Sequence, residues 1–244
     1  GKWKTKAAVK PMMGALDFAV GPSKDGRKAK STNRANQKIA TALGAVGDVQ
    51  AADQLMRLMK VTKDPYVKRS AIRALGKLRA KSAVDPLMEI MLDKNEKKPL
   101  RANAVFALGE IADPKVVNEM VKALYMEKAY FFSHANLALV KIGEPAVDLL
   151  VKTLKGENKE VKVLLESSMG ILEGALEANA AQVLGDIGSD KATEALLEMM
   201  DKVLKWEAET NKLLVVVRLI NALGDVGDKR AIDPILKVLD SKYW

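Results

Sequence analysis

The chain has 244 residues, of which 48% are hydrophobic and 5% aromatic, and it contains no cysteine. Disulfides and thiol chemistry are therefore excluded, and no run approaches the roughly twenty apolar residues needed to cross a bilayer. The net charge of +9 is uneven, because residues 1–82 carry 19 Lys or Arg and 5 Asp or Glu, whereas residues 83–244 carry 21 and 26. This basic end predicts attraction to polyanions or acidic surfaces, and the alternative is a merely solubilising surface.

The N-terminal segment, residues 4–19, is predicted to form a single helix. Its sequence from Ala8 to Met13 matches a phrase that recurs later in the second helix of each repeat, but no first helix precedes it. We therefore expect the second half of a broken repeat, packed against the hairpin that contains Leu43, and a chain that is a segment of a longer protein. The alternative is that residues 2–19 form an N-terminal cap.

Residues 20–33 are predicted to form a basic loop. The loop and the start of the following helix hold the predicted anion-binding residues: Lys24, Arg27, Lys28, Lys30, Arg34 and Lys38. Such a cluster would attract nucleic acid, anionic lipid headgroups or an acidic protein surface. No aromatic residue lies in 21–33 to stack on bases, which argues against single-stranded nucleic acid.

Two phrases then recur at intervals of about thirty residues, a period typical of stacked helical hairpins. The first phrase is Ala-Leu-Gly or a near copy, with its leucine at Leu43, Leu75, Leu108, Leu139, Leu184 and Leu223. The second phrase resembles Ala-Val-Asp-Pro-Leu and begins at Ala51, Ala83, Val116, Ala146, Ala192 and Ala231. Each hairpin of such an array buries its apolar face only against its neighbours.

The spacing inside the hairpins supports a helical array. The phrase leucine precedes an apolar residue of the second helix by 15 or 16 positions in all six repeats. Apolar residues such as Val84, Leu87 and Met91 recur at i, i+3 and i+7, which places them on one helix face. Nothing is typical of a strand. We predict an all-α, right-handed α–α superhelix of six hairpins plus an orphan N-terminal helix, running as one solenoid over residues 1–244.

Length varies only in the connections between hairpins, and these should lie on one edge of the array. The long connections are residues 20–33, 155–179 and 202–213. In the second of them, the apolar stretch that starts at Val161 predicts a short extra helix. This insertion is interpreted as a binding lip, and the alternative is a loop that covers a change in stacking angle. Trp206 in the third connection is a candidate partner contact.

No catalytic constellation is visible in the sequence. The single histidine, His134, is flanked by aromatic residues on a predicted helix and is interpreted as structural rather than as a general base. One histidine without cysteine leaves no zinc ligand set, and nucleophile elbows, phosphate-binding glycine loops and dinucleotide fingerprints are missing. Carboxylates alone leave a hard-cation site open, but acidic residues such as Asp53, Asp85 and Asp148 recur once per repeat, which favours a structural role. No catalytic residue, cofactor or metal is predicted.

The order Ala-Leu-Gly-x-Ile/Val-Gly-Asp-x-x-Ala-Val/Ile-x-Pro-Leu resembles the short HEAT-like repeats of phycocyanobilin lyases and many other bacterial proteins. The match is best at 222–235 and 42–55 and covers nearly the whole chain, with Val140 and Ala112 standing where glycine is usual. The resemblance implies the fold, whereas members of the wider family act as lyases, chaperone-like adaptors, scaffolds or base-excising proteins. The metal-dependent hydroxylase branch needs paired His-Glu motifs, which this chain lacks. The long edge loops are also similar to those of HEAT-repeat proteins of the bacterial cell envelope, some of which are lipid-anchored.

We predict a non-enzymatic scaffold or adaptor that binds protein partners through its concave surface and the edge of long loops. The alternative is a DNA- or polyanion-binding solenoid that uses the basic N-terminal end, and a lyase or glycosylase is a minor alternative. No signal sequence is visible, and the compartment stays open between the bacterial cytoplasm and the periplasm or cell envelope.

Overall fold

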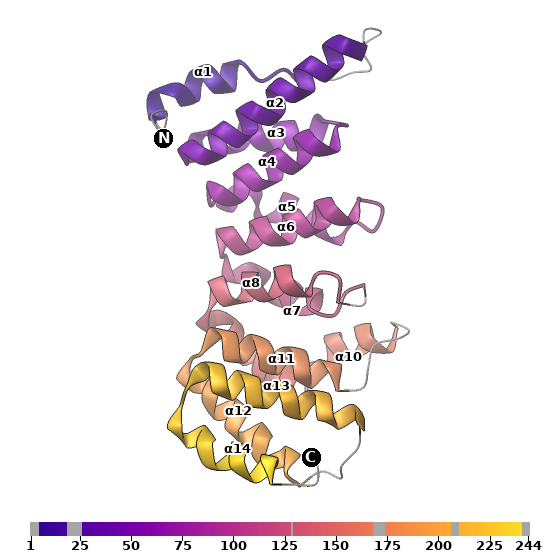
Figure 1. Ribbon diagram of the computed structural model, residues 1–244. Coiled ribbons are helices and arrows are strands. Elements are labelled where there is room, and N and C mark those ends of the chain that lie inside the picture. Colours follow the sequence, from indigo (N-terminus) through magenta and orange to yellow (C-terminus); the bar gives the residue numbers. More distant parts are fainter. Residues whose placement is uncertain (1–4, 19–25, 128, 168–173, 206–209, 241–244) are drawn as a thin grey trace. The chain divides into compact units, whose positions relative to one another are not determined.

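The computed structural model describes residues 5–18, 26–127, 129–167, 174–205 and 210–240. Within these ranges all regular structure is helical (Figure 1). It comprises fourteen α-helices and six short 3-10 helices. The chain divides into two compact units, unit 1 over Gly1–Val116 and unit 2 over Val117–Trp244. The predicted all-α fold is therefore confirmed, and the single continuous solenoid stays a prediction.

Unit 1 consists of two layers of helices. Its first helices are α2 (Gly26–Val46), α4 (Pro65–Lys77) and α6 (Lys98–Ile111), and its second helices are α1 (Val9–Gly14), α3 (Ala52–Val61) and α5 (Val84–Leu92). Helix α2 packs on α4 and α4 packs on α6, while α3 and α5 each pack against the first helix of the following repeat (Figure 1). The stack therefore places one face of every first helix on the same side of unit 1.

Unit 2 repeats this arrangement and adds one helix. Its first helices are α8 (Phe132–Ile142), α11 (Ala175–Ile187) and α13 (Thr210–Val226), its second helices are α7 (Val117–Ala123), α9 (Val147–Leu154), α12 (Asp190–Val203) and α14 (Ile232–Leu239), and the added helix is α10 (Lys159–Glu166). Helix α11 packs against α8, α9 and α13, and α12 packs against α9, α13 and α14. The added helix contacts α7.

The glycine of the Ala-Leu-Gly phrase lets successive first helices approach closely. A Cβ atom built on Gly76 would lie 2.8 Å from the Cα of Ala107, and one built on Gly185 would lie 2.6 Å from the Cα of Ala222. Backbone atoms cannot move aside for such contacts without displacing a helix. In such a phrase, the alanine thus contacts the phrase glycine of the preceding first helix. The leucine lies in the core, and the glycine contacts the phrase alanine of the following first helix.

Helix ends follow from capping and from left-handed residues. The carboxylate of Asp64 accepts hydrogen bonds from the backbone N–H groups of Tyr66 and Val67, which starts α4. Gly188 ends α11 in the left-handed region with φ of 65°. Ala112 adopts the same region with φ of 54° at the end of α6, where the family pattern has glycine. Alanine in place of glycine is therefore tolerated at this position, at a conformational free-energy cost on the order of 1 kcal/mol.

The predicted N-terminal helix is shorter than expected but packs as expected. Residues Lys6–Ala8 form a 3-10 helix and α1 ends at Gly14, so the prediction of a helix over residues 4–19 is wrong in its length. The physical reason is Gly14, since glycine has low helix propensity. Helix α1 packs against α2, in the hairpin that contains Leu43.

The three predicted loops are also too long. Helix α2 begins at Gly26, so residues 26–33 are helical, because the alanine, lysine and arginine residues after this glycine are good helix formers. Helices α11 and α13 begin at Ala175 and Thr210, which shortens the loops predicted over 155–179 and 202–213. The extra helix predicted from Val161 is confirmed as α10.

Candidate binding groove on the first helices of unit 1

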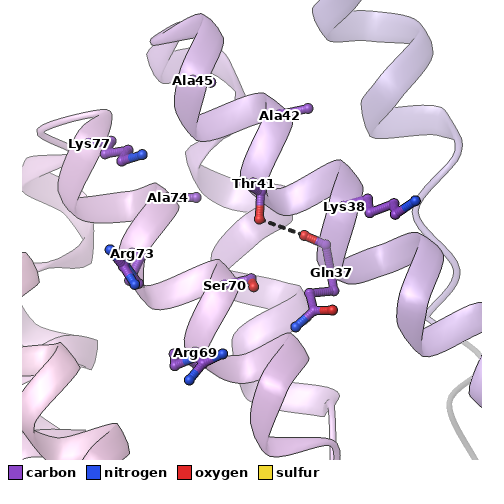
Figure 2. Close-up of a pocket in the computed structure, with 10 residues that line it drawn as sticks. All are labelled: Gln37, Lys38, Thr41, Ala42, Ala45, Arg69, Ser70, Arg73, Ala74 and Lys77. Carbon is purple, nitrogen blue, oxygen red and sulfur yellow. Dashed lines mark hydrogen bonds between the residues drawn. The ribbon is translucent and has the colours of Figure 1, made fainter.

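A groove lies between the exposed faces of α2 and α4 in unit 1 (Figure 2). It encloses about 560 Å³ and is lined by Gln37, Lys38, Thr41, Ala42, Ala45, Arg69, Ser70, Arg73, Ala74 and Lys77. The hydroxyl of Thr41 donates a hydrogen bond of 2.8 Å to the carbonyl oxygen of Gln37, so it is engaged within its own helix. The alanines are too short to fill the space between the longer side chains, which leaves the groove open.

Four of the ten lining residues are cationic and none is acidic. Lys38, Arg73 and Lys77 are exposed and Arg69 is half-buried. No carboxylate in the described part of the chain forms an ion pair with any of the four. The guanidinium carbon of Arg69 lies 5.4 Å from the ring centroid of Tyr66 in a cation–π contact. The groove therefore presents positive charge that the described fold does not neutralise.

Helical periodicity organises these cations into rows. Arg69, Arg73 and Lys77 stand at intervals of four on α4, which places them on one helix face over about 12 Å. A second row with the same interval lies on α2: Lys30, Arg34 and Lys38. Only the last residue of this second row reaches the groove, because the other two lie one and two turns nearer the start of α2.

The structure places only part of the predicted anion-binding set. Lys38 lines the groove, and Lys30 and Arg34 are exposed on α2. The remaining predicted site residues lie outside the residues whose side chains the structure describes: Lys24, Arg27, Lys28 and Trp206. Their predicted contacts with partners stay predictions.

The sequence prediction omits the three cations of α4. It follows the basic cluster in residues 21–33 rather than the face of each helix, although residues 69–81 contain five Lys or Arg and no acidic residue. These three cations can be found from their positions relative to the phrase leucine, Leu75. Arg69 and Arg73 stand six and two residues before it, and Lys77 stands two residues after it. These positions line the groove because the leucine itself faces the core.

Unit 2 has an equivalent groove between α11 and α13. It encloses about 530 Å³ and is lined by Gln182, Arg218, Ile220, Asn221, Ala222, Gly224 and Asp225. Its one cation, Arg218, is balanced by one carboxylate, Asp225. This groove is therefore polar without a net charge.

The described residues contain no group of three or more His, Cys, Asp or Glu side chains that could hold a metal ion. His134 is half-buried on α8, and its buried Nδ1 has no hydrogen-bond partner in the described structure. Neither groove is lined by histidine or cysteine. Of the described helices, none combines the length and the apolar character that a transmembrane span requires.

The extra helix α10 is attached to α7 by polar contacts. The Lys122 ammonium lies 2.5 Å from a carboxylate oxygen of Glu160, and the Asn118 side-chain amide donates to the same carboxylate at 3.2 Å. Both hydrogen bonds, with that from Lys122 the stronger, lower the pKa of the Glu160 carboxyl. Helix α10, which lies in the predicted binding lip, is thus held against α7 by the first turn of α10.

Two layers of paired helices joined by a glycine–alanine contact define an α-solenoid. Residues 29–98 and 91–170 match HEAT repeats, and residues 215–241 match the PBS lyase HEAT-like repeat. Because these HEAT matches span more than half of the sequence, the chain belongs to the HEAT repeat family. No curated protein matches the chain in sequence.

Several solved structures are similar to the chain. One is from the complex of CpcE and CpcF of phycocyanin lyase from Nostoc sp. PCC7120, with 20% identity, coverage of 97% of this chain and 84% of that chain, and a TM-score of 0.46. An engineered protein has 20% identity, coverage of 96% and 64%, and a TM-score of 0.45. Human deoxyhypusine hydroxylase in complex with glycerol has 14% identity, coverage of 99% and 94%, and a TM-score of 0.35. Likenesses of this size carry no argument about function.

Proposed function

We propose that the chain is a non-enzymatic binding scaffold that holds an acidic protein segment along the first-helix face of unit 1. The observation that supports this most directly is the groove between α2 and α4, which has four cations, no carboxylate in its lining and no ion pair within the described fold. Like charges held close together repel, and an anionic ligand relieves that repulsion. Complementary charge would also speed association and orient the partner.

The spacing of the α4 cations suits a peptide. Successive residues of the row Arg69, Arg73 and Lys77 are about 6 Å apart along the helix axis. Acidic residues four apart on a helix have the same spacing, and alternate residues of an extended strand are about 6.6 Å apart. Ala42, Ala45 and other small residues leave room between the cations for the aliphatic parts of a ligand. A segment with regularly spaced carboxylates therefore complements the groove.

Binding of duplex DNA or another polyanion is the second candidate. The observation that favours it is the excess of 19 basic over 5 acidic residues in positions 1–82, which includes Lys30 and Arg34 outside the groove. Phosphate contacts of this kind are independent of sequence and weaken steeply with salt. The groove lining has no aromatic residue for stacking on bases, which makes single-stranded nucleic acid a poorer ligand.

The proposal is tested by fluorescence anisotropy with a labelled peptide of alternating glutamate and leucine. The variant Arg69→Glu/Arg73→Glu/Lys77→Glu should weaken binding about 100-fold, since three lost contacts of roughly 1 kcal/mol each give that factor. A matched control, Lys60→Glu/Lys63→Glu/Lys81→Glu, changes the net charge of unit 1 equally but alters no residue of the groove.

The two triple variants separate the possible results. The proposal requires the groove variant to lose far more affinity than the control. Equal losses would attribute binding to net charge alone and contradict the proposal. A short DNA duplex that binds tightly while the peptide does not would instead favour the polyanion candidate.

A further inference from the structure

The side chains that line the α2–α4 groove of unit 1 are rich in hydrogen-bond donors. The four cations Lys38, Arg69, Arg73 and Lys77 only donate, because guanidinium and ammonium groups have no acceptor atom. The lining contains no carboxylate, so no charged acceptor within it competes with a ligand for these donors. A ligand that only accepts hydrogen bonds therefore complements the groove best.

The two arginines of the groove are neighbours on α4. Arg69 and Arg73 are four residues apart, and Ser70 and Arg73 are three apart, so the Cβ atoms of each pair lie about 5–6 Å from each other on one helix face. Within the described part of the chain, the Ser70 hydroxyl has no hydrogen-bond partner. Lys38 lines the same groove from α2 (Figure 2). Donors from two helices thus border one space.

Arg69 is positioned by a neighbour before any ligand binds. It is half-buried, and its guanidinium carbon lies 5.4 Å from the ring centroid of Tyr66. A guanidinium group that packs on an aromatic ring keeps the N–H groups at its edge available, and these can bind an acceptor in pairs. Less side-chain entropy is therefore lost when a ligand contacts Arg69.

We propose that Lys38, Arg69, Ser70 and Arg73 bind the phosphate of a phosphoserine in the acidic segment, an inference that rests on the function proposed above and names the ligand's central group. A phosphate monoester carries close to two negative charges and three terminal acceptor oxygens, whereas a glutamate carboxylate has one charge and two oxygens. The phosphate can therefore accept hydrogen bonds from both guanidinium groups and from the Lys38 ammonium at once.

The charge and size of the groove favour this ligand over nucleic acid. The phosphates that link nucleotides are diesters, and each has one charge and two free oxygens. Four cations around about 560 Å³, with no carboxylate among the lining residues, match the higher charge of a monoester. The alanines of the lining also leave room for a side chain to enter, whereas a duplex is too wide to do so: Ala42, Ala45 and Ala74.

The test compares three peptides by fluorescence anisotropy at one salt concentration and about pH 7, where a phosphoserine is close to doubly charged. The peptides share the alternating glutamate–leucine sequence and differ at one central position, which is serine, glutamate or phosphoserine. The phosphoserine peptide should bind at least about tenfold more tightly than the glutamate peptide, because its added charge and oxygen strengthen the hydrogen bonds. The serine peptide should bind most weakly.

A charge-conserving variant tests the arginines. Arg69→Lys/Arg73→Lys keeps the charge of the groove but removes both planar guanidinium groups. It should lower the preference for phosphoserine over glutamate from about tenfold to about twofold, because an ammonium binds phosphate as a point charge. The matched control, Arg57→Lys/Arg79→Lys, changes two exposed arginines of unit 1 that do not line the groove, and it should retain the full preference.

The outcomes separate this inference from the proposed function. If the glutamate peptide binds and phosphoserine adds nothing, or if the groove variant keeps the full preference, the phosphate site is overturned and the proposed function stands. If none of the three peptides binds, both are wrong. A short DNA duplex or inorganic phosphate that competes as strongly as the phosphoserine peptide would also overturn the inference, because the groove would then bind phosphate from any source.

Discussion

The groove between α2 and α4 and the groove between α11 and α13 enclose similar volumes, about 560 and 530 Å³. Both are built in the same way, since a phrase glycine on one first helix, Gly44 or Gly185, receives the alanine of the next, Ala74 or Ala222. Their linings differ in charge, because the groove of unit 1 has four cations and that of unit 2 has one cation and one carboxylate.

The difference separates the positions that build the scaffold from those that choose the ligand. Alanine, leucine and glycine of the phrase are fixed by the packing of one first helix on another. Positions such as those of Arg73 and Asn221, which both stand two residues before the phrase leucine, face the groove and are free of that packing. A repeat protein of this type can therefore change its ligand without changing its stack.

The largest expected effect concerns the shared scaffold. Gly44→Ala and Gly185→Ala should each lower the free energy of unfolding by about 3 kcal/mol, because the new methyl groups would overlap backbone atoms of the next first helix. Gly224→Ala is the matched control and should raise it by roughly 0.5–1 kcal/mol, since nothing lies near that site. Urea unfolding followed by circular dichroism measures all three. A large loss in only one unit would show that the two grooves are not built alike.

A smaller effect is expected when charge is moved between the grooves. In the chain that carries Arg69→Glu/Arg73→Glu/Lys77→Glu, the further changes Asn221→Arg and Asp225→Lys should recover acidic-peptide affinity about tenfold, since they give the unit 2 groove a net positive charge. The measurement is again fluorescence anisotropy. If affinity did not recover, the shape of unit 1, in addition to its charge, would be needed for binding.

Removal of one hydrogen bond should affect stability and leave binding unchanged. The buried Tyr125 hydroxyl donates a hydrogen bond of 2.8 Å to the carbonyl oxygen of Leu176, which joins the segment after α7 to α11 within unit 2. Burial raises the pKa of this phenol far above its usual value, so it stays a donor. Tyr125→Phe should cost about 1 kcal/mol of unfolding free energy. Peptide affinity at unit 1 serves as the control, and a fall in that affinity would contradict the assignment of binding to unit 1.

The smallest expected effect is a pH dependence of α10. Because hydrogen bonds from Lys122 and Asn118 lower the pKa of Glu160, the contact stabilises α10 fully above the unfolded-state pKa of about 4.3. It is lost as the pH falls through the lower folded-state value, so α10 amides should exchange faster only in that acidic range. Glu160→Gln should remove the dependence, as hydrogen exchange at several pH values would show. A transition near neutral pH would contradict this assignment.

Sequence periodicity is sufficient to predict the helix pairs, because the spacing within a hairpin is set by local packing around residues such as Leu43 and Leu184. It failed at the start of α2, because residues 20–33 are predicted as a loop although good helix formers follow Gly26 at once. The α4 row of the groove was missed because the face of a helix emerges only when its register is counted from the buried leucine. The contact between Tyr125 and Leu176 spans 51 positions and depends on how the insertion folds, so no local sequence pattern predicts it.

The binding of an acidic segment by unit 1 is tested most directly by site-specific photo-crosslinking in the full chain. A photoreactive amino acid replaces Ser70 in one variant and Asn221 in another, which places the same probe in each of the two grooves. With the glutamate–leucine peptide, crosslinks should form from position 70, should be weak or missing from position 221, and should disappear at about 0.5 M salt, where surface charges are screened. Equal crosslinking from both positions, or none from position 70, would contradict the proposed function.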